Sequence, residues 1–357
     1  MKHEELLQST LKDIVKVDSV WIDRAEERQA QLTKPRGSLG RLEEIANRLC
    51  GIQQNLAPSL GHPRILLFAA DHGVCEEGVS PYPQSVTSQM VLNFLKGGAA
   101  INAIARTNNV DLRIVDVGLR TPVPATSDLV HRPIARGTGN LSRVPAMSRV
   151  QAIDALAVGI EMAAEARADG ARIIGIGEMG IGNTTAAAAV TSALTNQAAT
   201  DVVGIGAGAD LRAMGRKVEV VGRAISLHRQ FEDALDILSK LGAFEIAAMC
   251  GACLGAAALR VGMVADGFIS TCAAALAVRF EPSVRDYLFA AHRSTEPGHR
   301  PLLKIIEQAP LLDLEMRLGE GTGAALAMSI IRSAVATFTQ METFSSASVS
   351  RAAEEGP

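Results

Sequence analysis

Long apolar runs recur along the chain, and the clearest of them end at a Gly or an Asp and precede an alanine-rich stretch. Continuous apolar runs of this length are typical of parallel strands buried on both faces, with helices as their connections. The pattern predicts an α/β sheet with helices on both faces and a ligand site beyond the carboxyl ends of its strands. Strands are predicted at 64–70, 111–117, 172–176 and 261–265, and a further short one is predicted to begin at Val202 and Val203.

The pattern changes at both ends of the chain. Residues 1–60 favour helices, because apolar residues recur there at helical spacing. We expect this region to belong to a small helical domain that a C-terminal helix at 324–343 completes, while 61–323 form the main α/β domain. Residues 344–357 are small and polar without periodicity, which predicts a frayed tail.

Composition narrows the class of protein. Hydrophobic residues make up 48% of the 357 residues and aromatic residues only 3%, so Ala, Val, Ile and Leu must build most of the interior. This composition excludes a chain that is disordered over most of its length. The formal net charge of -3 supplies no basic field, and no nucleic-acid partner is therefore expected.

Three features bear on location. Acids stand at residues 4 and 5, where a signal peptide has an uncharged apolar run, so no secretion signal is expected. The longest uncharged stretch, 179–200, holds many Asn, Gln, Ser and Thr residues, so no membrane span is expected. Five cysteines at irregular spacing predict free thiols in a reducing cytoplasm. The pair Cys250 and Cys253 lies in an apolar, small-residue segment, which favours a packed helix over a metal or redox site.

The densest chemical signal is the glycine-rich segment 175–185, which follows an apolar run and precedes an alanine-rich stretch. A strand, a glycine loop and a helix in this order expose backbone N–H groups that can bind a phosphate. Residues 175, 177 and 180 also match G-x-G-x-x-G, with Asp201 about 20 residues on, so a dinucleotide site is an alternative. A tight turn without a ligand is a second alternative.

A second glycine cluster lies at 204–208, and two such loops at adjacent strand ends could share one nucleotide. Taken alone it is equally compatible with a plain turn. The chain has no G-x-x-x-x-G-K-[ST] motif and no paired-acid loop of the kind that holds Mg²⁺ on a pyrophosphate. A nucleoside monophosphate therefore fits better than a polyphosphate.

Glu320 is the candidate general base, since it stands between two glycines beside apolar residues and before a buried helix. Partial burial would raise the pKa of its carboxyl group, whereas a nearby helix N-terminus would oppose that shift. The alternative is a glutamate that only caps the helix.

Two polar loops complete the inventory. The loop 71–84 mixes polar groups with Tyr82 and two prolines, which suits a flat heteroaromatic ligand but also an ordinary surface loop. Asp71 and His72 could in principle bind a metal, yet no partner at metal-ligand spacing supports this. His292 and His299 are expected to be satisfied within a loop rather than to ligate zinc.

Six ordered motifs give the chain a resemblance to a known family. It resembles the nicotinate-nucleotide:dimethylbenzimidazole phosphoribosyltransferases of cobalamin lower-ligand assembly from about residue 30 to residue 335. The motifs lie at 34–43 (KPRGSLGRLE), 70–84 (ADHGV and GVSPYPQ), 177–185 (GEMGIGNTT), 266–269 (DGFI), 292–298 (HRS and EPG) and 317–323 (RLGEGTG).

The resemblance implies a reaction and an architecture. The phosphoribosyl group of nicotinate mononucleotide would pass to a ring nitrogen of 5,6-dimethylbenzimidazole, giving α-ribazole 5′-phosphate and nicotinate, with Glu320 as the base. It also implies a homodimer, a Rossmann-like, mostly parallel sheet and a small helical domain. No metal and no cofactor are expected.

The family's other roles carry over residue by residue. The azole pocket would be lined by Ser80, Tyr82, Gln89, Met179 and Leu318. The nucleotide would be held at its phosphate by Gly180, Gly182, Asn183, Thr184 and Gly206, with Glu178, Asp266 and Ser294 near the ribose and nicotinate. One departure stands in the second glycine loop, where Ile205 and Ala207 replace an expected Arg and hydroxyl, and this predicts weaker nucleotide affinity or an altered donor.

Two other functions remain alternatives at this point. A non-catalytic azole or nucleotide binding protein on the same fold would explain the altered second glycine loop. A nicotinamide-dependent oxidoreductase would explain the G-x-G-x-x-G match.

Overall fold

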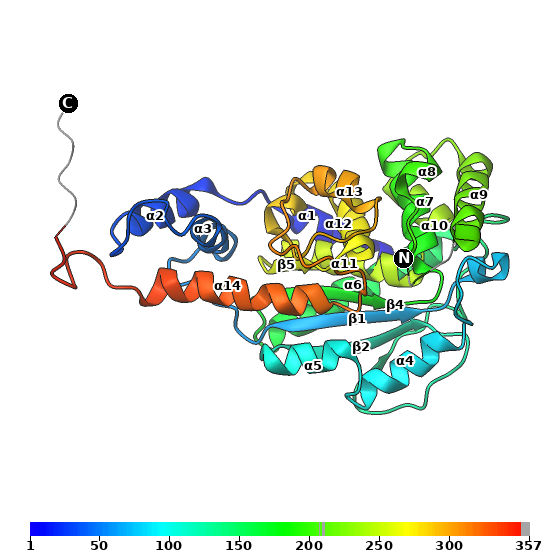
Figure 1. The fold of residues 1–357 in the computed structure, drawn as a ribbon, viewed down its shortest axis with the longest axis horizontal. Helices are drawn as coiled ribbons and strands as arrows, with labels where there is room; N and C mark the ends of the chain where they lie inside the picture. The colour runs from blue at the N-terminus through cyan, green and yellow to red at the C-terminus, as the bar shows by residue number, and fades with distance from the viewer. Residues whose placement is uncertain (207, 209–210, 351–357) are drawn as a thin grey trace.

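The fold is described here from a computed structural model, which describes residues 1–206, 208 and 211–350. Within these ranges six strands form one sheet in the order β3-β2-β1-β4-β5-β6, and every neighbouring pair is parallel (Figure 1). The expected α/β class is confirmed. The strands are β1 (Arg64–Ala70), β2 (Asp111–Gly118), β3 (Leu129–His131), β4 (Ile173–Met179), β5 (Gly262–Ala265) and β6 (Leu288–Ala290).

The strand order places a ligand site. The chain builds the sheet outward from β1 in one direction and from β4 in the other, so the connections that leave the carboxyl ends of these two strands diverge. In open α/β sheets the crevice at such a reversal of strand order is where ligands bind.

The sequence-based strand assignment needs one correction. Val202 is the last residue of the short helix α8 (Ala199–Val202), and Val203 is extended but belongs to no strand, so the strand predicted there is wrong. The side chains of Val202 and Val203 are both buried in the region between β4 and β5. The edge positions of the sheet belong to β3 and β6, which are only three residues long and carry too short an apolar pattern to be predicted.

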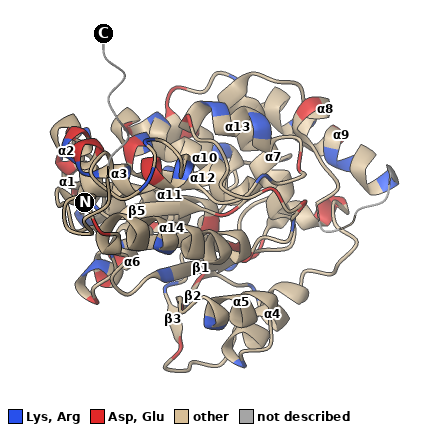
Figure 2. Ribbon diagram, turned by 60° about the vertical axis from the view of Figure 1, so that its left-hand side comes forward, with Lys and Arg blue, Asp and Glu red and all other residues tan. Residues whose placement is uncertain are grey.

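Helices cover both faces of the sheet. Besides α8, the helices are α1 (Lys2–Asp13), α2 (Ser19–Gln29), α3 (Arg41–Gln53), α4 (Val86–Leu95), α5 (Ala100–Thr107), α6 (Arg149–Ala168), α7 (Asn183–Thr195), α9 (Leu211–His228), α10 (Ala234–Leu241), α11 (Phe244–Ala258), α12 (Phe268–Phe280), α13 (His299–Ile306) and α14 (Thr322–Gln340), with 3₁₀ helices at Gly73–Glu77 and Pro282–Tyr287. Helices α4, α5 and α14 lie on one side of the sheet, and α11 and α12 lie on the other, where α6 packs on α11 (Figure 1). Figure 2 shows that Lys, Arg, Asp and Glu residues lie on outer helices such as α2, α9 and α13.

The two ends of the chain meet. Helix α3 packs against α14, Leu32 forms a β-bridge with Thr343, and the Phe344 N–H donates to the Gln31 carbonyl. The division into a small helical domain and an α/β domain stays a prediction. So does the frayed tail, of which 351–357 lie outside the described residues.

One helix, α14, is long and apolar enough to cross a membrane by length and composition alone. In this structure 56% of its apolar window is buried inside the protein, where α14 packs on α3, α5 and β4. Such burial is typical of a core helix.

Small residues let α6 and α11 approach closely. A Cβ atom added to Gly159 in α6 would lie 1.8 Å from the Ala248 carbonyl oxygen, and one added to Gly251 in α11 would lie 2.0 Å from the Leu156 carbonyl oxygen. The same helix α11 holds Cys250 and Cys253, both fully buried and unbridged, which confirms the packed helix expected there.

Gly159→Ala tests this packing. Because its new methyl group has no room, we expect the substitution to lower the free energy of unfolding by about 2 kcal/mol or more. Gly222→Ala is the matched control, since Gly222 also lies inside a helix but a Cβ there has no neighbour within 4 Å; it should raise stability by up to about 1 kcal/mol. Equal effects in denaturant titrations would refute the close approach.

Candidate active site

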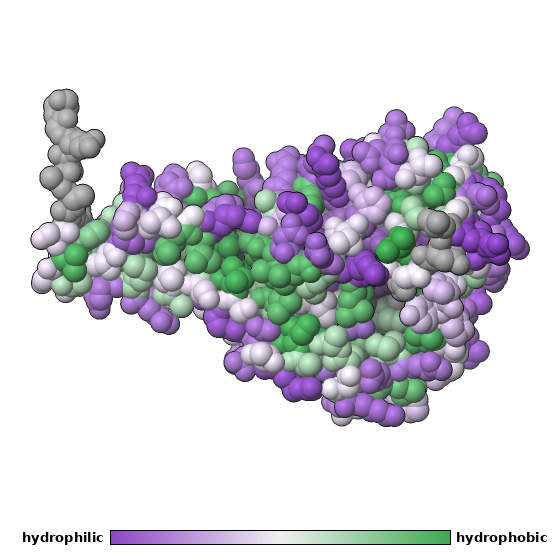
Figure 3. All heavy atoms as spheres, in the orientation of Figure 1, coloured by the Kyte–Doolittle hydropathy of each residue, from purple (hydrophilic) through white to green (hydrophobic). Residues whose placement is uncertain are grey.

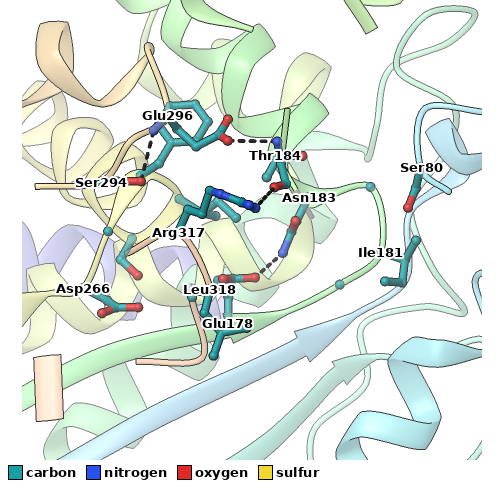
Figure 4. Close-up of a pocket in the computed structure, with 18 of the residues that line it drawn as sticks. Ser80, Glu178, Ile181, Asn183, Thr184, Asp266, Ser294, Glu296, Arg317 and Leu318 are labelled. Atoms are coloured by element: carbon teal, nitrogen blue, oxygen red, sulfur yellow. Dashed lines mark hydrogen bonds between the residues drawn. The ribbon is translucent and has the colours of Figure 1, made fainter. Parts of the chain in front are cut away.

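A cavity opens beyond the carboxyl ends of β1, β4, β5 and β6 (Figure 4). Most of the predicted site residues line it, namely Ser80, Glu178, Gly180, Gly182, Asn183, Thr184, Gly206, Asp266, Ser294 and Leu318.

Four predicted residues lie beside this lining rather than in it. Tyr82 is 49% exposed on the loop after β1, and Gln89 is exposed on α4. Met179 is half-buried as the last residue of β4. The fourth is Glu320, which directly follows the lining residues Leu318 and Gly319.

Glu320 is buried, with 6% of its surface exposed, and it is held in a left-handed backbone conformation (φ 64°) between two glycines of the same hand. Its backbone N–H donates to Glu178, and its side chain accepts the Ile101 N–H at the start of α5. Its Oε2 atom is buried and has no hydrogen-bond partner among the described residues.

Burial and a nearby helix N-terminus were expected to shift the pKa of Glu320 in opposite directions, and in the folded chain the effect of burial is the larger. Burial raises the pKa of Glu320, the Ile101 N–H opposes the shift, and the charge of Asp266 adds to it. The helix N-terminus whose backbone opposes the shift is that of α5, through the Ile101 N–H, rather than that of the following α14.

Buried acids gather around the end of β4. Glu178 faces Glu245, Asp266 and Glu320, and its carboxylate accepts a hydrogen bond from the Asn183 amide. Burial and these three like charges raise its pKa well above the usual value, and the Glu320 N–H opposes the shift only in part. On the far side, His72 Nε2 lies 2.9 Å from Glu245 Oε1.

Asp266 supports the loop that carries Glu320. Its two oxygens accept the N–H groups of Gly321 at 3.1 Å and Ala324 at 3.0 Å, so it caps the start of α14. Burial raises its pKa, while the neighbouring His292 and the backbone donors oppose the shift.

The opposite end of the cavity is cationic. Lys217, on α9, donates to Thr184 Oγ1 at 3.1 Å, and Arg317 donates to the Gly206 carbonyl at 3.1 Å. Both side chains line the cavity, as does Glu296. Burial lowers the pKa of Lys217, and the Glu296 charge opposes that shift.

None of these three residues was predicted from the sequence. Arg317 and Glu296 lie inside two of the six family motifs, at 317–323 and 292–298, so a usable signal was present there. Lys217 lies on a helix without a motif and could not be found in this way. Of the two departures in the second glycine loop, Ile205 is 40% exposed, and Ala207 lies outside the described residues.

Two of the other polar loop residues, Asp71 and His299, have partners within the protein, whereas His292 Nδ1 is buried without a hydrogen-bond partner among the described residues. The expectation that His292 is satisfied within its loop is therefore not met at this atom. Asp71 Oδ2 accepts the Arg120 N–H at 2.8 Å, and His299 bonds to Thr271 Oγ1 and to the Ser294 N–H. Across residues 1–206, 208 and 211–350 no group of three His, Cys, Asp or Glu side chains is arranged to hold a metal ion.

Comparison with known proteins decides the family. The DBI_PRT family model, described as a phosphoribosyltransferase, matches residues 14–349. A nicotinate-nucleotide--dimethylbenzimidazole phosphoribosyltransferase from Geobacter metallireducens is 47% identical over 351 residues, which cover 98% of this chain and 99% of that protein. The chain belongs to this phosphoribosyltransferase family.

Further relatives agree with this assignment. The phosphoribosyltransferase of the same name from Chloroflexus aurantiacus is 47% identical over 347 residues, 97% of this chain and 99% of that protein. The crystal structure of the Thermus thermophilus phosphoribosyltransferase superposes with a TM-score of 0.89 at 44% identity, covering 94% of this chain and all of that one. The resemblance and the fold class expected from the sequence are confirmed.

The buried acid Glu178 in the phosphoribosyltransferase site should make the stability of the folded protein depend on pH. Because the pKa of Glu178 is raised in the folded chain, its contribution to stability is full below the unfolded value and is lost as pH rises toward the folded pKa. The Glu178→Gln variant has no acid to ionise at this position, so it does not lose this stability as pH rises. The unfolding free energy of the variant minus that of wild type should therefore increase by more than about 1 kcal/mol from about pH 4 to about pH 8.

Glu219→Gln, at an exposed position on α9, is the control and should show no such trend. A pH-independent difference for Glu178→Gln in denaturant titrations would show that the acid is ionised in the folded protein at no cost.

Proposed function

We propose that this phosphoribosyltransferase moves the phosphoribosyl group of nicotinate mononucleotide to 5,6-dimethylbenzimidazole or a related azole. The products would be α-ribazole 5′-phosphate and nicotinate. The observation that carries the proposal is a buried carboxylate with an unpartnered oxygen, Glu320 Oε2, directly after the lining of a cavity whose other end holds Lys217 and Arg317.

The chemistry needs one base and no metal. The nicotinate leaving group is already a pyridinium in the mononucleotide, so its departure requires no general acid. The azole attacks C1′ through one nitrogen and must lose the proton on its other nitrogen. A single displacement inverts the sugar from the β to the α anomer, and no pyrophosphate is present that would require Mg²⁺.

Two observations support Glu320 as the group that takes that proton. Of its two carboxylate oxygens, Oε2 has no hydrogen-bond donor among the described residues, so it can accept the azole N–H, while the Ile101 N–H fixes the carboxyl group. A raised pKa makes this carboxylate a stronger base than an exposed glutamate. Ser80 and Leu318 would contact the azole, with Tyr82, Gln89 and Met179 around the mouth of the pocket.

The phosphate would bind at the cationic end. The loop 180–182 leads into the N-terminus of α7, where backbone N–H groups and the helix dipole favour an anion. Thr184, Lys217 and the Gly206 N–H converge on the same space, with Asn183 beside them. Glu178 and Ser294 also line the cavity, and the ribose would lie near them.

We also propose a homodimer, as the family resemblance implies, and a cytoplasmic location, as the irregularly spaced cysteines predict. Figure 3 supports the dimer, because apolar residues gather on the face that α14 crosses.

Glu320→Gln tests the base. The amide can still accept the Ile101 N–H but cannot take a proton, so kcat should fall by a factor of about 10²–10⁴ while azole binding by calorimetry persists. In wild type kcat/KM should fall as pH drops through the raised pKa of Glu320, and this acidic limb should vanish in the variant. The assay follows α-ribazole 5′-phosphate formed without added metal.

Glu315→Gln is the matched control, since Glu315 is an exposed glutamate of the same loop that also has a positive φ. Its kcat should equal that of wild type. Wild-type turnover by Glu320→Gln would rule out Glu320 as the base.

Lys217→Met tests the phosphate end. The substitution removes the buried ammonium but keeps much of the side-chain volume, so KM for the nucleotide should rise about ten- to hundredfold. KM for the azole should stay the same. Arg212→Met, which removes an exposed cation earlier on the same helix, should change neither value in steady-state kinetics.

A further inference from the structure

One acid lies at the end of the cavity where an anion is expected. Glu296 is 6% exposed, lines the cavity and directly precedes the turn into α13. Its Oε1 atom accepts the Gly206 N–H at 2.8 Å, and the carbonyl of the same glycine accepts a hydrogen bond from Arg317. Figure 4 shows Glu296 and Arg317 at this end of the cavity. A backbone donor of the second glycine loop is therefore already engaged by a carboxylate.

The other oxygen of Glu296 is unpartnered. Its Oε2 atom is buried and accepts no hydrogen bond from any described residue. The Lys217 ammonium lies against the same glycine, because a Cβ on Gly206 would be 2.6 Å from Nζ, and the charge of Glu296 acts on it. Glu296 thus presents a carboxylate to one backbone donor and one cation, which are the groups that a phosphate would use.

The orientation of Glu296 separates it from the sugar. Its Oε2 packs against the second glycine loop, where a Cβ on Gly204 would lie 2.2 Å away. Its backbone N–H donates to Ser294 Oγ at 3.3 Å, which fixes the turn at that position. The carboxylate therefore points toward the phosphate end rather than toward Asp266 and Glu320.

We propose that Glu296 stands in for the donor's 5′-phosphate in the free enzyme and thereby limits the affinity and the charge of the donor. The proposal rests on the function proposed above. When phosphate arrives, it takes the Gly206 N–H from Glu296 and lies beside Lys217, and the displaced carboxylate faces another anion. Like charges in a partly desolvated site repel, so each additional negative charge on the donor is disfavoured.

Glu296→Gln tests the proposal. Its amide oxygen can still accept the Gly206 N–H, but the negative charge is gone. We expect ribose 5-phosphate and nicotinate mononucleotide to bind about tenfold tighter in calorimetry. Nicotinate riboside, the same donor without phosphate, should bind with unchanged affinity, because it brings no charge to this end.

Two further variants test whether an effect of Glu296→Gln comes from the lost charge at this site. One controls for the size of the side chain and the other for the net charge of the protein. Glu296→Asp shortens the side chain but keeps its charge, so it should not tighten binding of either phosphate compound. Glu307→Gln removes an exposed acid at the end of α13 and should have no effect. Equal or weaker binding of ribose 5-phosphate by Glu296→Gln would overturn the proposal, as would equal tightening by Glu296→Asp.

A measurement on the wild-type protein covers the case in which Glu296→Gln fails to fold. Because phosphate only replaces a carboxylate, nicotinate mononucleotide should bind less than about a hundredfold tighter than nicotinate riboside. A larger difference in affinity between the two donors would refute the proposal that the phosphate takes the place of the Glu296 carboxylate. Failure of the Lys217→Met prediction would instead count against the phosphate end itself, so the two proposals can fail separately.

Discussion

The site depends on a close backbone contact between the end of β4 and the loop that follows Leu318. A Cβ on Gly177 would lie 2.5 Å from the Gly321 nitrogen and 2.6 Å from the Glu320 carbonyl carbon, so only glycine allows the loop to rest on the strand. Asp266 then pins the loop through two backbone N–H groups. This contact buries Glu320 and aims it past the strand toward α5.

The second constraint is electrostatic. Glu178, Glu245, Asp266 and Glu320 are all buried near one another, while Lys217 and Arg317 lie at the opposite end of the cavity. Burial and neighbouring like charges raise the pKa values of Glu178 and Glu320 and cost stability. An acidic end would also suit the proposed displacement, in which positive charge develops on the sugar as the pyridinium leaves, because fixed dipoles and charges stabilise such a transition state.

Part of this arrangement could be predicted from the sequence. The four long strands and the first glycine loop were predictable, because continuous apolar runs and clustered glycines are local signals. The edge strands β3 and β6 were not, since three residues carry too little pattern, and Val202 and Val203 were misassigned because a short apolar pair fits a buried helix end equally well. Burial of Glu320 was a reasonable expectation, but its partner Ile101 lies more than two hundred positions earlier and is found only in the folded chain.

The second glycine loop shows that residues far away in the sequence can supply the cations of a phosphate site. Ile205 cannot donate a hydrogen bond from its side chain, so a loop-based argument predicts a weaker phosphate site. The folded chain brings Lys217 from α9 and Arg317 from the loop before α14 onto the same glycine, Gly206. Cations supplied by distant elements can replace one missing from the loop, because a phosphate responds to the summed charge and donors around it rather than to their order along the chain. A buried lysine, however, needs a counter-charge when no phosphate is bound, and Glu296 is the acid whose charge acts on it.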